Sequence, residues 1–185
     1  RAFRRAGGDP HILVLKNLSP ADVAESCEAL VRELDKAQIL MLPGGFSGGD
    51  EPMLAKFIAS FFRNPAVADA VNRLLNQRDG LALDLNGFQA LIKLGLVPYG
   101  EIRPITEEDP TLTFNTIHRH QSMLVRTRVA SNKSPWLSRC DINDEHLIAI
   151  SHGEGRFVCN EKLLNQLIEN GQVATSMLTC SAARR

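Results

Sequence analysis

The segment from Leu81 to Gln89 has the form of an enzyme elbow but carries no nucleophile. Leu81 to Leu85 is an apolar run, and Asn86-Gly87-Phe88-Gln89 follows as a tight turn that leads into a helix. Many α/β enzymes place a nucleophile at such a strand–turn–helix junction. No Ser, Thr or Cys stands in this segment. Asp84 is the one acidic residue there, and we expect it to accept hydrogen bonds from turn amides rather than to act as a catalytic acid.

A glycine-rich segment, Gly44 to Asp50, follows an earlier apolar run, Ile39 to Leu42. Successive backbone amides in such a turn can form a concave nest for an anion or oxyanion, although a flexible connection is the commoner outcome. The segment also matches the G-x-S-x-G pattern of serine hydrolases, with Ser47 as nucleophile. That elbow needs a helix directly after the serine, which two glycines and Pro52 delay. A serine hydrolase is therefore the less favoured alternative.

Histidines occur in two further segments. Ser151 to Phe157 places His152, Glu154 and Arg156 in one loop, which would suit acid–base chemistry. A Glu154–Arg156 ion pair beside a hydrogen-bonded histidine is the commoner outcome for such a cluster. His118 and His120 stand two residues apart, but without paired ligands nearby we expect no metal site there.

Strand-like and helix-like segments alternate along the chain. This alternation predicts an α/β fold, with a doubly wound, mostly parallel sheet and helices on both faces. Leu124 to Val129 alternates apolar and polar residues, whereas Leu147 to Ile150 is continuously apolar, so we expect the first strand to be half exposed and the second to be central. The other expected strands are 11–15, 39–42 and 81–85, and the expected helices are 20–35, 52–62, one beginning at 64–65, 87–94 and 160–171.

Composition favours small molecules or proteins as partners. The chain has 185 residues, with 21 Lys plus Arg balanced by 21 Asp plus Glu, and no long single-sign run. We therefore expect neither nucleic-acid nor membrane binding. The four cysteines show no close pairing, and no signal peptide or membrane-spanning apolar run is present, which favours the cytoplasm.

The two ends of the sequence lack the expected pattern. Arg1 to Ala6 is helix-like with no strand or cap before it, so we expect the true N-terminus to be missing. Residues 176–185 have no periodicity and end in arginines. The sequence thus predicts a partial domain over residues 1–175 and a frayed or foreign tail over residues 176–185.

Four segments resemble one family in their order and spacing. They are M-L-P-G-G-F-S-G-G-D-E-P at 41–52, N-G-F-Q-A-L-I-K-L-G-L-V-P-Y-G-E at 86–101, R-H-Q-S-M-L-V at 119–125 and S-H-G-E-G-R-F at 151–157. Together they resemble the glutaminase domain of phosphoribosylformylglycinamidine synthases, a class I glutamine amidotransferase with a flavodoxin-like fold. The resemblance covers nearly all of residues 1–175.

The resemblance implies a reaction and its partners. Such a domain hydrolyses glutamine and supplies ammonia for purine biosynthesis, with ATP and Mg²⁺ expected only in the associated synthetase domain, which is either part of the same chain or a separate subunit. No cofactor is expected in this domain. By resemblance, the amides of Gly44, Gly45 and Phe46 would hold the oxyanion, and Gln89 would help to hold the glutamine substrate.

The same resemblance exposes what the chain lacks. The family's nucleophilic cysteine should stand just before Asn86, but the elbow is one residue shorter there and has no cysteine. The family's catalytic histidine and glutamate lie beyond S-H-G-E-G-R-F, and the chain reaches its aperiodic tail first. Losing a nucleophile typically costs about a million-fold in turnover. We therefore expect an enzyme by family but no appreciable glutaminase activity, with a non-catalytic module that binds glutamine or packs on the synthetase as the alternative.

Overall fold

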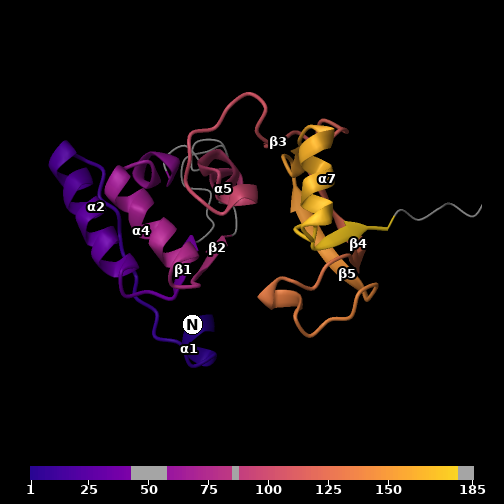
Figure 1. Ribbon diagram of the computed structural model, residues 1–185, viewed down its shortest axis with the longest axis horizontal. Helices are drawn as coiled ribbons and strands as arrows, with labels where there is room; N and C mark the ends of the chain where they lie inside the picture. Colours follow the sequence, from indigo (N-terminus) through magenta and orange to yellow (C-terminus); the bar gives the residue numbers. More distant parts are fainter. Residues whose placement is uncertain (43–57, 85–87, 179–185) are drawn as a thin grey trace, which may run out of the picture. The chain divides into compact units, whose positions relative to one another are not determined.

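The computed structural model describes residues 1–42, 58–84 and 88–178. The chain divides into two compact units, Arg1–Ile105 and Thr106–Arg185 (Figure 1).

The first unit contains a parallel pair of strands. β1 (Ile39–Leu42) pairs with β2 (Leu81–Asp84), with Ile39 opposite Leu81 and Leu42 opposite Asp84. A connection that contains α4 (Pro65–Asn76) joins them. Parallel strands need such a crossover, and the predicted parallel arrangement of these two strands is confirmed.

Helices build the core of the first unit. α2 (Pro20–Leu34) packs against α4, and the two run side by side in Figure 1. α5 (Phe88–Leu94) and α6 (Leu96–Tyr99) follow β2, whereas α1 (Ala2–Arg5) begins the chain. The largest side chains buried at the centre come from α4, α5 and the helical residues 58–62; they are Phe62, Val67, Val71, Leu74 and Leu94.

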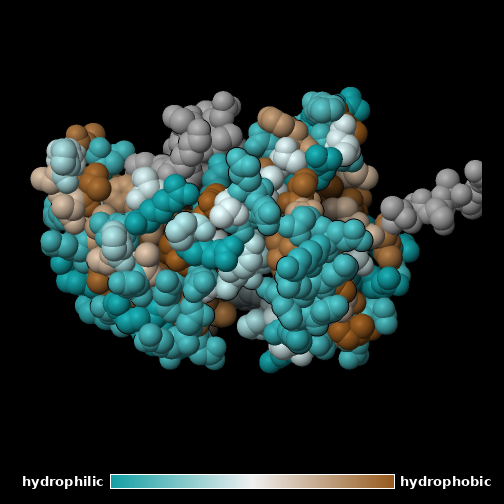
Figure 2. All heavy atoms as spheres, turned by 45° about the horizontal axis from the view of Figure 1, so that its top comes forward, coloured by the Kyte–Doolittle hydropathy of each residue, from teal (hydrophilic) through white to brown (hydrophobic). Residues whose placement is uncertain are grey.

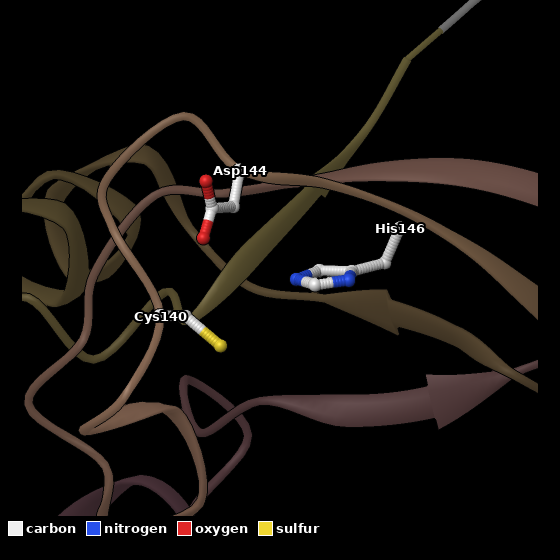
Figure 3. A group of neighbouring side chains, drawn as sticks. All are labelled: Cys140, Asp144 and His146. Carbon is white, nitrogen blue, oxygen red and sulfur yellow. The ribbon is translucent and has the colours of Figure 1, made fainter.

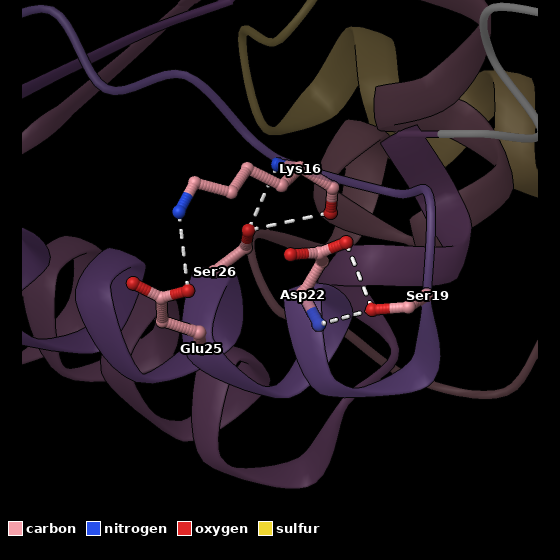
Figure 4. A network of polar contacts seen from close by, with 5 residues as sticks. All are labelled: Lys16, Ser19, Asp22, Glu25 and Ser26. Atoms are coloured by element: carbon pink, nitrogen blue, oxygen red, sulfur yellow. Dashed lines mark hydrogen bonds and ion pairs between the residues drawn. The ribbon is translucent and has the colours of Figure 1, made fainter.

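Local hydrogen bonds begin α2 where the sequence predicts it. Ser19 Oγ accepts a hydrogen bond from the Asp22 amide at 3.1 Å and donates one to the Asp22 carboxylate at 2.8 Å (Figure 4). Pro20 occupies the first helical position, where a missing N–H costs nothing. Upstream, the Lys16 amide donates to Ser26 Oγ at 2.8 Å, and the Lys16 ammonium group pairs with Glu25 at 3.1 Å.

The predicted strand at residues 11–15 is wrong. This segment has no regular secondary structure, and Ile12 is 92% exposed. Its apolar run indicated a buried strand, but the contacts at Lys16 hold the chain beside α2 instead. No strand in the described part of the chain pairs with it.

The second unit is built from antiparallel strands. β4 (Gln121–Val129) lies between β5 (Glu145–His152) and β7 (Thr175–Met177), and β3 (Thr111–Thr113) pairs with β6 (Arg156–Val158). A short 3₁₀ turn, η1 (Pro135–Leu137), lies in the connection between β4 and β5. α7 (Glu161–Glu169) begins at the predicted cap, where Asn160 Oδ1 accepts a hydrogen bond from the Leu163 amide at 2.8 Å.

Two expectations for this unit need correction. Among the described strands β5 lies at the edge of its sheet, not at its centre, and Leu147 within it is 66% exposed. A continuous apolar run does not say by itself where a strand lies in a sheet. Ser176 and Met177 fall within the predicted tail, yet they belong to β7 and pair with β4. Residues 179–185 lie outside the described part of the chain.

The face drawn in Figure 2 is mainly hydrophilic, with scattered apolar patches. The exposed apolar residues of the second unit include Leu124, Leu147, Ile148 and Met177 from the three-stranded sheet. Among the described residues, no helix is both long enough and apolar enough to cross a bilayer.

Candidate functional site

Both segments predicted to bind a ligand in the first unit leave the sheet at the same edge. Because β1 and β2 are parallel and Leu42 lies opposite Asp84, their carboxyl ends are adjacent. In the sequence, the glycine-rich segment comes directly after β1, and the turn of the elbow comes directly after β2. Open α/β sheets bind ligands at this edge. The predicted oxyanion residues Gly44, Gly45 and Phe46, together with Ser47 and Asn86, lie outside the described residues, so their roles stay predictions.

Gln89, the last residue of the elbow, is buried. It lies in the first turn of α5, the helix that follows β2, and the residue is only 8% exposed. A buried amide side chain needs hydrogen-bond partners, which makes its position specific. Leu91 and Leu94 of the same helix belong to the core cluster. The helix that carries Gln89 is therefore anchored by its own apolar side.

The end of α5 is fixed by a glycine. Gly95 has φ +85°, a left-handed conformation that favours glycine. A Cβ atom there would lie 2.8 Å from Arg103 Cγ, and the Arg103 amide donates to the Leu94 carbonyl at 3.0 Å. The Arg103 guanidinium in turn stacks on the Tyr99 ring at 3.6 Å from its centroid. These contacts end the helix at the predicted residue.

The described cysteines offer no replacement nucleophile in the elbow. Cys27 lies on the apolar side of α2 and is buried in the core. Burial raises the pKa of the Cys27 thiol, which disfavours the reactive thiolate. Cys140 and Cys159 are free thiols of the second unit, and Cys180 lies outside the described residues.

The predicted His152 loop forms a hydrogen-bonded cluster around Asn115. The Asn115 side-chain NH₂ donates to the carbonyl oxygens of His152 at 2.8 Å and Arg119 at 3.1 Å. A carbonyl oxygen can only accept a hydrogen bond, so these two contacts fix which end of the Asn115 amide is the NH₂ group. The other end, Oδ1, therefore faces His152 Nδ1, at 3.0 Å. The Asn115 amide also donates to the Gly153 carbonyl at 2.9 Å. A neutral His152 thus carries its proton on Nδ1.

Gly155 makes room for this imidazole. A Cβ atom at position 155 would lie 2.4 Å from His152 Nδ1. The prediction of a hydrogen-bonded histidine is therefore confirmed, whereas the Glu154–Arg156 ion pair stays a prediction. His120, one of the two histidines considered for a metal, instead lies 2.9 Å from Ser151 Oγ through its Nε2 atom. Sequence reasoning missed Asn115, since nothing local links it to a loop 37 residues away.

Comparison with known families matches nearly the whole chain. Residues 1–181 match the CobB/CobQ-like glutamine amidotransferase domain family.

Individual relatives agree with that match. The chain is 30% identical over 180 residues to phosphoribosylformylglycinamidine synthase subunit PurQ of Methanococcus maripaludis, which covers 95% of this chain and 59% of that protein. The fold of the present chain is similar to the structure of PurLQS from Thermotoga maritima, with a TM-score of 0.52 and 26% sequence identity. The match covers 69% of this chain and 53% of the Thermotoga chain. The chain thus spans little more than half the length of these relatives. The structural match supports the predicted class I glutamine amidotransferase fold.

Proposed function

Because the chain belongs to the CobB/CobQ-like glutamine amidotransferase domain family, we propose that it is glutaminase-derived and serves a phosphoribosylformylglycinamidine synthase of purine biosynthesis. The observation that carries this proposal is the 30% identity to a PurQ subunit over 95% of the chain. The adjacent carboxyl ends of β1 and β2 support a ligand site at that edge of the sheet.

Glutamine is the proposed ligand of that edge. Its amide would lie between the glycine-rich segment after β1 and the first turn of α5 after β2. Gln89 can both donate and accept hydrogen bonds, which suits recognition of an amino acid with an amide side chain. Its burial in a packed helix supports a positioning role, because a rigid element holds a binding group more accurately than a free loop.

We propose that this chain binds glutamine without hydrolysing it appreciably. Hydrolysis in a class I glutaminase needs a thiolate at the elbow, and residues 81–89 contain no cysteine. Cys27 is buried with a raised pKa and belongs to α2 rather than to the elbow. Cys27 is the one cysteine in residues 1–105, so the first unit has no thiol at the elbow that could take the covalent step.

A synthetase component is the proposed protein partner. One solved structure with a similar fold is that of PurLQS from Thermotoga maritima. By this analogy the chain would pack against a synthetase domain that binds ATP and Mg²⁺, in the same polypeptide or as a separate subunit, and would need no cofactor of its own. A cytoplasmic location fits this pathway.

The first experiment incubates the chain with glutamine and, separately, with an electrophilic glutamine analogue. We expect saturable glutamine binding by calorimetry, no ammonia release and no covalent adduct at the elbow. Ammonia together with an adduct on one of the cysteines would overturn the proposed inactivity. An adduct on Ser47 would instead favour the serine hydrolase. Absence of glutamine binding would remove the glutamine-binding role and leave packing on the synthetase.

A second experiment places a thiol where the family has one. Leu85→Cys introduces it just before Asn86, and Leu147→Cys introduces a matched thiol on an exposed leucine of the second unit. We expect the electrophilic analogue to label both variants, with glutamine protecting only the thiol introduced at position 85. Equal labelling of both in the presence of saturating glutamine would contradict a glutamine site at the elbow.

A further inference from the structure

Three side chains of the second unit bring metal-ligating atoms together near the start of β5. Cys140, Asp144 and His146 each offer one ligand atom, and these atoms all lie within 4.8 Å of one another. Figure 3 shows the thiol, one carboxylate oxygen and the edge of the imidazole facing a common space. Over residues 1–42, 58–84 and 88–178, this is the one group of three or more such residues.

The strand geometry places two of these ligands on the same side. Asp144 and His146 are two residues apart, and side chains at i and i+2 of an extended chain point to the same face. Asp144 directly precedes β5, and His146 lies within it. The Val129 amide donates to the Asp144 carbonyl at 2.9 Å, and His146 lies opposite Thr127 in the β4–β5 pairing.

The loop between β4 and β5 brings the third ligand back to this face. The Cys140 amide donates to the Leu137 carbonyl at 3.0 Å, closing the turn after η1. Asn132 Nδ2 donates to the Cys140 carbonyl at 3.2 Å. Cys140 is a half-buried free thiol, so it is neither fully buried nor part of a disulfide bond.

A hydrogen bond also orients the carboxylate. Asp144 Oδ2 accepts a hydrogen bond from the Asp141 amide at 2.9 Å, and the Asp144 amide donates to the Asp141 carbonyl at 3.1 Å. Contacts of this kind, one step outside a metal's ligands, fix the direction of the ligands and tune their affinity. The turn therefore holds the carboxylate in place while leaving it acceptor sites for a cation.

We propose that Cys140, Asp144 and His146 bind a Zn²⁺ ion. Thiolate, imidazole and carboxylate are the three side-chain ligand types of zinc, and a water molecule would complete the tetrahedron. Zinc–ligand bonds of about 2.0–2.3 Å set tetrahedral ligands roughly 3.3–3.6 Å apart, so atoms that now lie within 4.8 Å of one another need to approach by at most about 1.5 Å. The donor set does not suit Mg²⁺ or Ca²⁺, which prefer oxygen ligands alone. Binding joins the β4–β5 loop to the start of β5.

This site is independent of the proposed glutamine function. Its ligands come from the loop and strand of the second unit, whereas the elbow and Gln89 belong to the first. A metal at this position needs no part in glutamine binding, so failure of either proposal leaves the other testable.

The test titrates the metal-free full chain with Co²⁺ and then displaces it with Zn²⁺. We expect one Co²⁺ per chain, with the near-ultraviolet thiolate charge-transfer band and the visible bands of a tetrahedral site. Cys140→Ser should abolish the thiolate band and weaken Zn²⁺ binding, measured by competition with a chromogenic chelator, by at least about tenfold, since even partners outside the ligand sphere are worth 10–100-fold. Cys159→Ser, at another half-buried free thiol, should change neither.

Two further variants guard against a folding artefact. Asp144→Asn and His146→Gln should each weaken Zn²⁺ binding while retaining the circular dichroism spectrum of the parent chain. The proposal is overturned if the parent shows no thiolate–cobalt band. It is also overturned if the band survives in Cys140→Ser or is lost equally in Cys159→Ser.

Discussion

Replacing Asn115 with alanine would remove the centre of the hydrogen-bonded cluster in the second unit. Its side chain is 7% exposed and makes three hydrogen bonds, two to the carbonyl oxygens of His152 and Arg119 and one to His152 Nδ1. The substitution keeps the backbone hydrogen bond to Gly153. Asn115→Ala therefore tests whether this side chain holds the His152 loop in place.

The expected cost follows from the number of hydrogen bonds and from water access. Three bonds at about 1 kcal/mol each give about 3 kcal/mol as the full loss. Arg119 is exposed and His152 is half buried, so water can reach part of what is left unpaired. We therefore expect about 2 kcal/mol, which corresponds to a roughly 30-fold larger opening equilibrium.

Hydrogen exchange followed by mass spectrometry measures this opening locally. Amides of the segment 145–158 should exchange roughly 30-fold faster in Asn115→Ala when closing is fast, because exchange then follows the opening equilibrium. Asn132→Ala is the matched control, since Asn132 is exposed and its one side-chain bond, to the Cys140 carbonyl, measures 3.2 Å. We expect less than about threefold acceleration of segment 145–158 in the control. Unchanged exchange in Asn115→Ala, or equal acceleration in both variants, would refute the reasoning.

Three further predictions concern other positions. Gly155→Ala should force the neighbouring imidazole to move and lose its bond to the amide oxygen, costing about 1 kcal/mol of stability, with a shift in the imidazole NMR signals as the check. Leu74→Ala, at a fully buried core position, should lower the free energy of unfolding by about 2–5 kcal/mol in urea titrations. Leu164→Ala, at an exposed position, should lower it by well under half of that amount. Equal decreases in the two variants would contradict the assigned core. Burial raises the pKa of the Cys27 thiol, so its contribution to stability is fully present below the pKa of the unfolded chain and is lost as pH rises through the pKa of the folded state. Alkylation at pH 8 should therefore modify half-buried Cys140 well before Cys27. Faster alkylation of Cys27 would contradict this prediction.

Helix starts were predictable because their signals are local. Asn64-Pro65 and Asn160 begin helices where expected, and in each case the Asn side chain accepts a hydrogen bond from an amide in the first turn. A capping residue and the amide it binds are two or three positions apart, so both lie within one short window of sequence.

Strand placement was less predictable because it depends on distant partners. The run at 39–42 became β1 with a parallel neighbour, while the equally apolar run at 11–15 is not a strand. Leu147 to Ile150 is a strand as expected but lies at an edge. Hydrophobicity identifies a segment that can be buried, and only the rest of the fold decides whether a neighbouring strand is present.

The same distinction applies to the candidate sites. The elbow, which ends at Gln89, is continuous in sequence and could be recognised there. Asn115 meets its histidine across 37 residues, and Cys140 reaches its two companions through a loop. The C-x₃-D-x-H spacing was visible beforehand, but nothing in it revealed that the three side chains face one space.

The anchoring on either side of the elbow limits how its lost residue could be restored. Asp84 is fixed by pairing with Leu42, and α5 is fixed by burial of Leu91 and Leu94. Sliding β2 by one position would turn each of its side chains to the opposite face, and turning α5 would pull its leucines from the core. β2 and α5 are therefore each held in place by partners outside the residues between them. Because the sequence predicts an elbow one residue shorter than the family's, we expect a point substitution to supply a thiol and an insertion to be needed as well for the geometry of a working glutaminase.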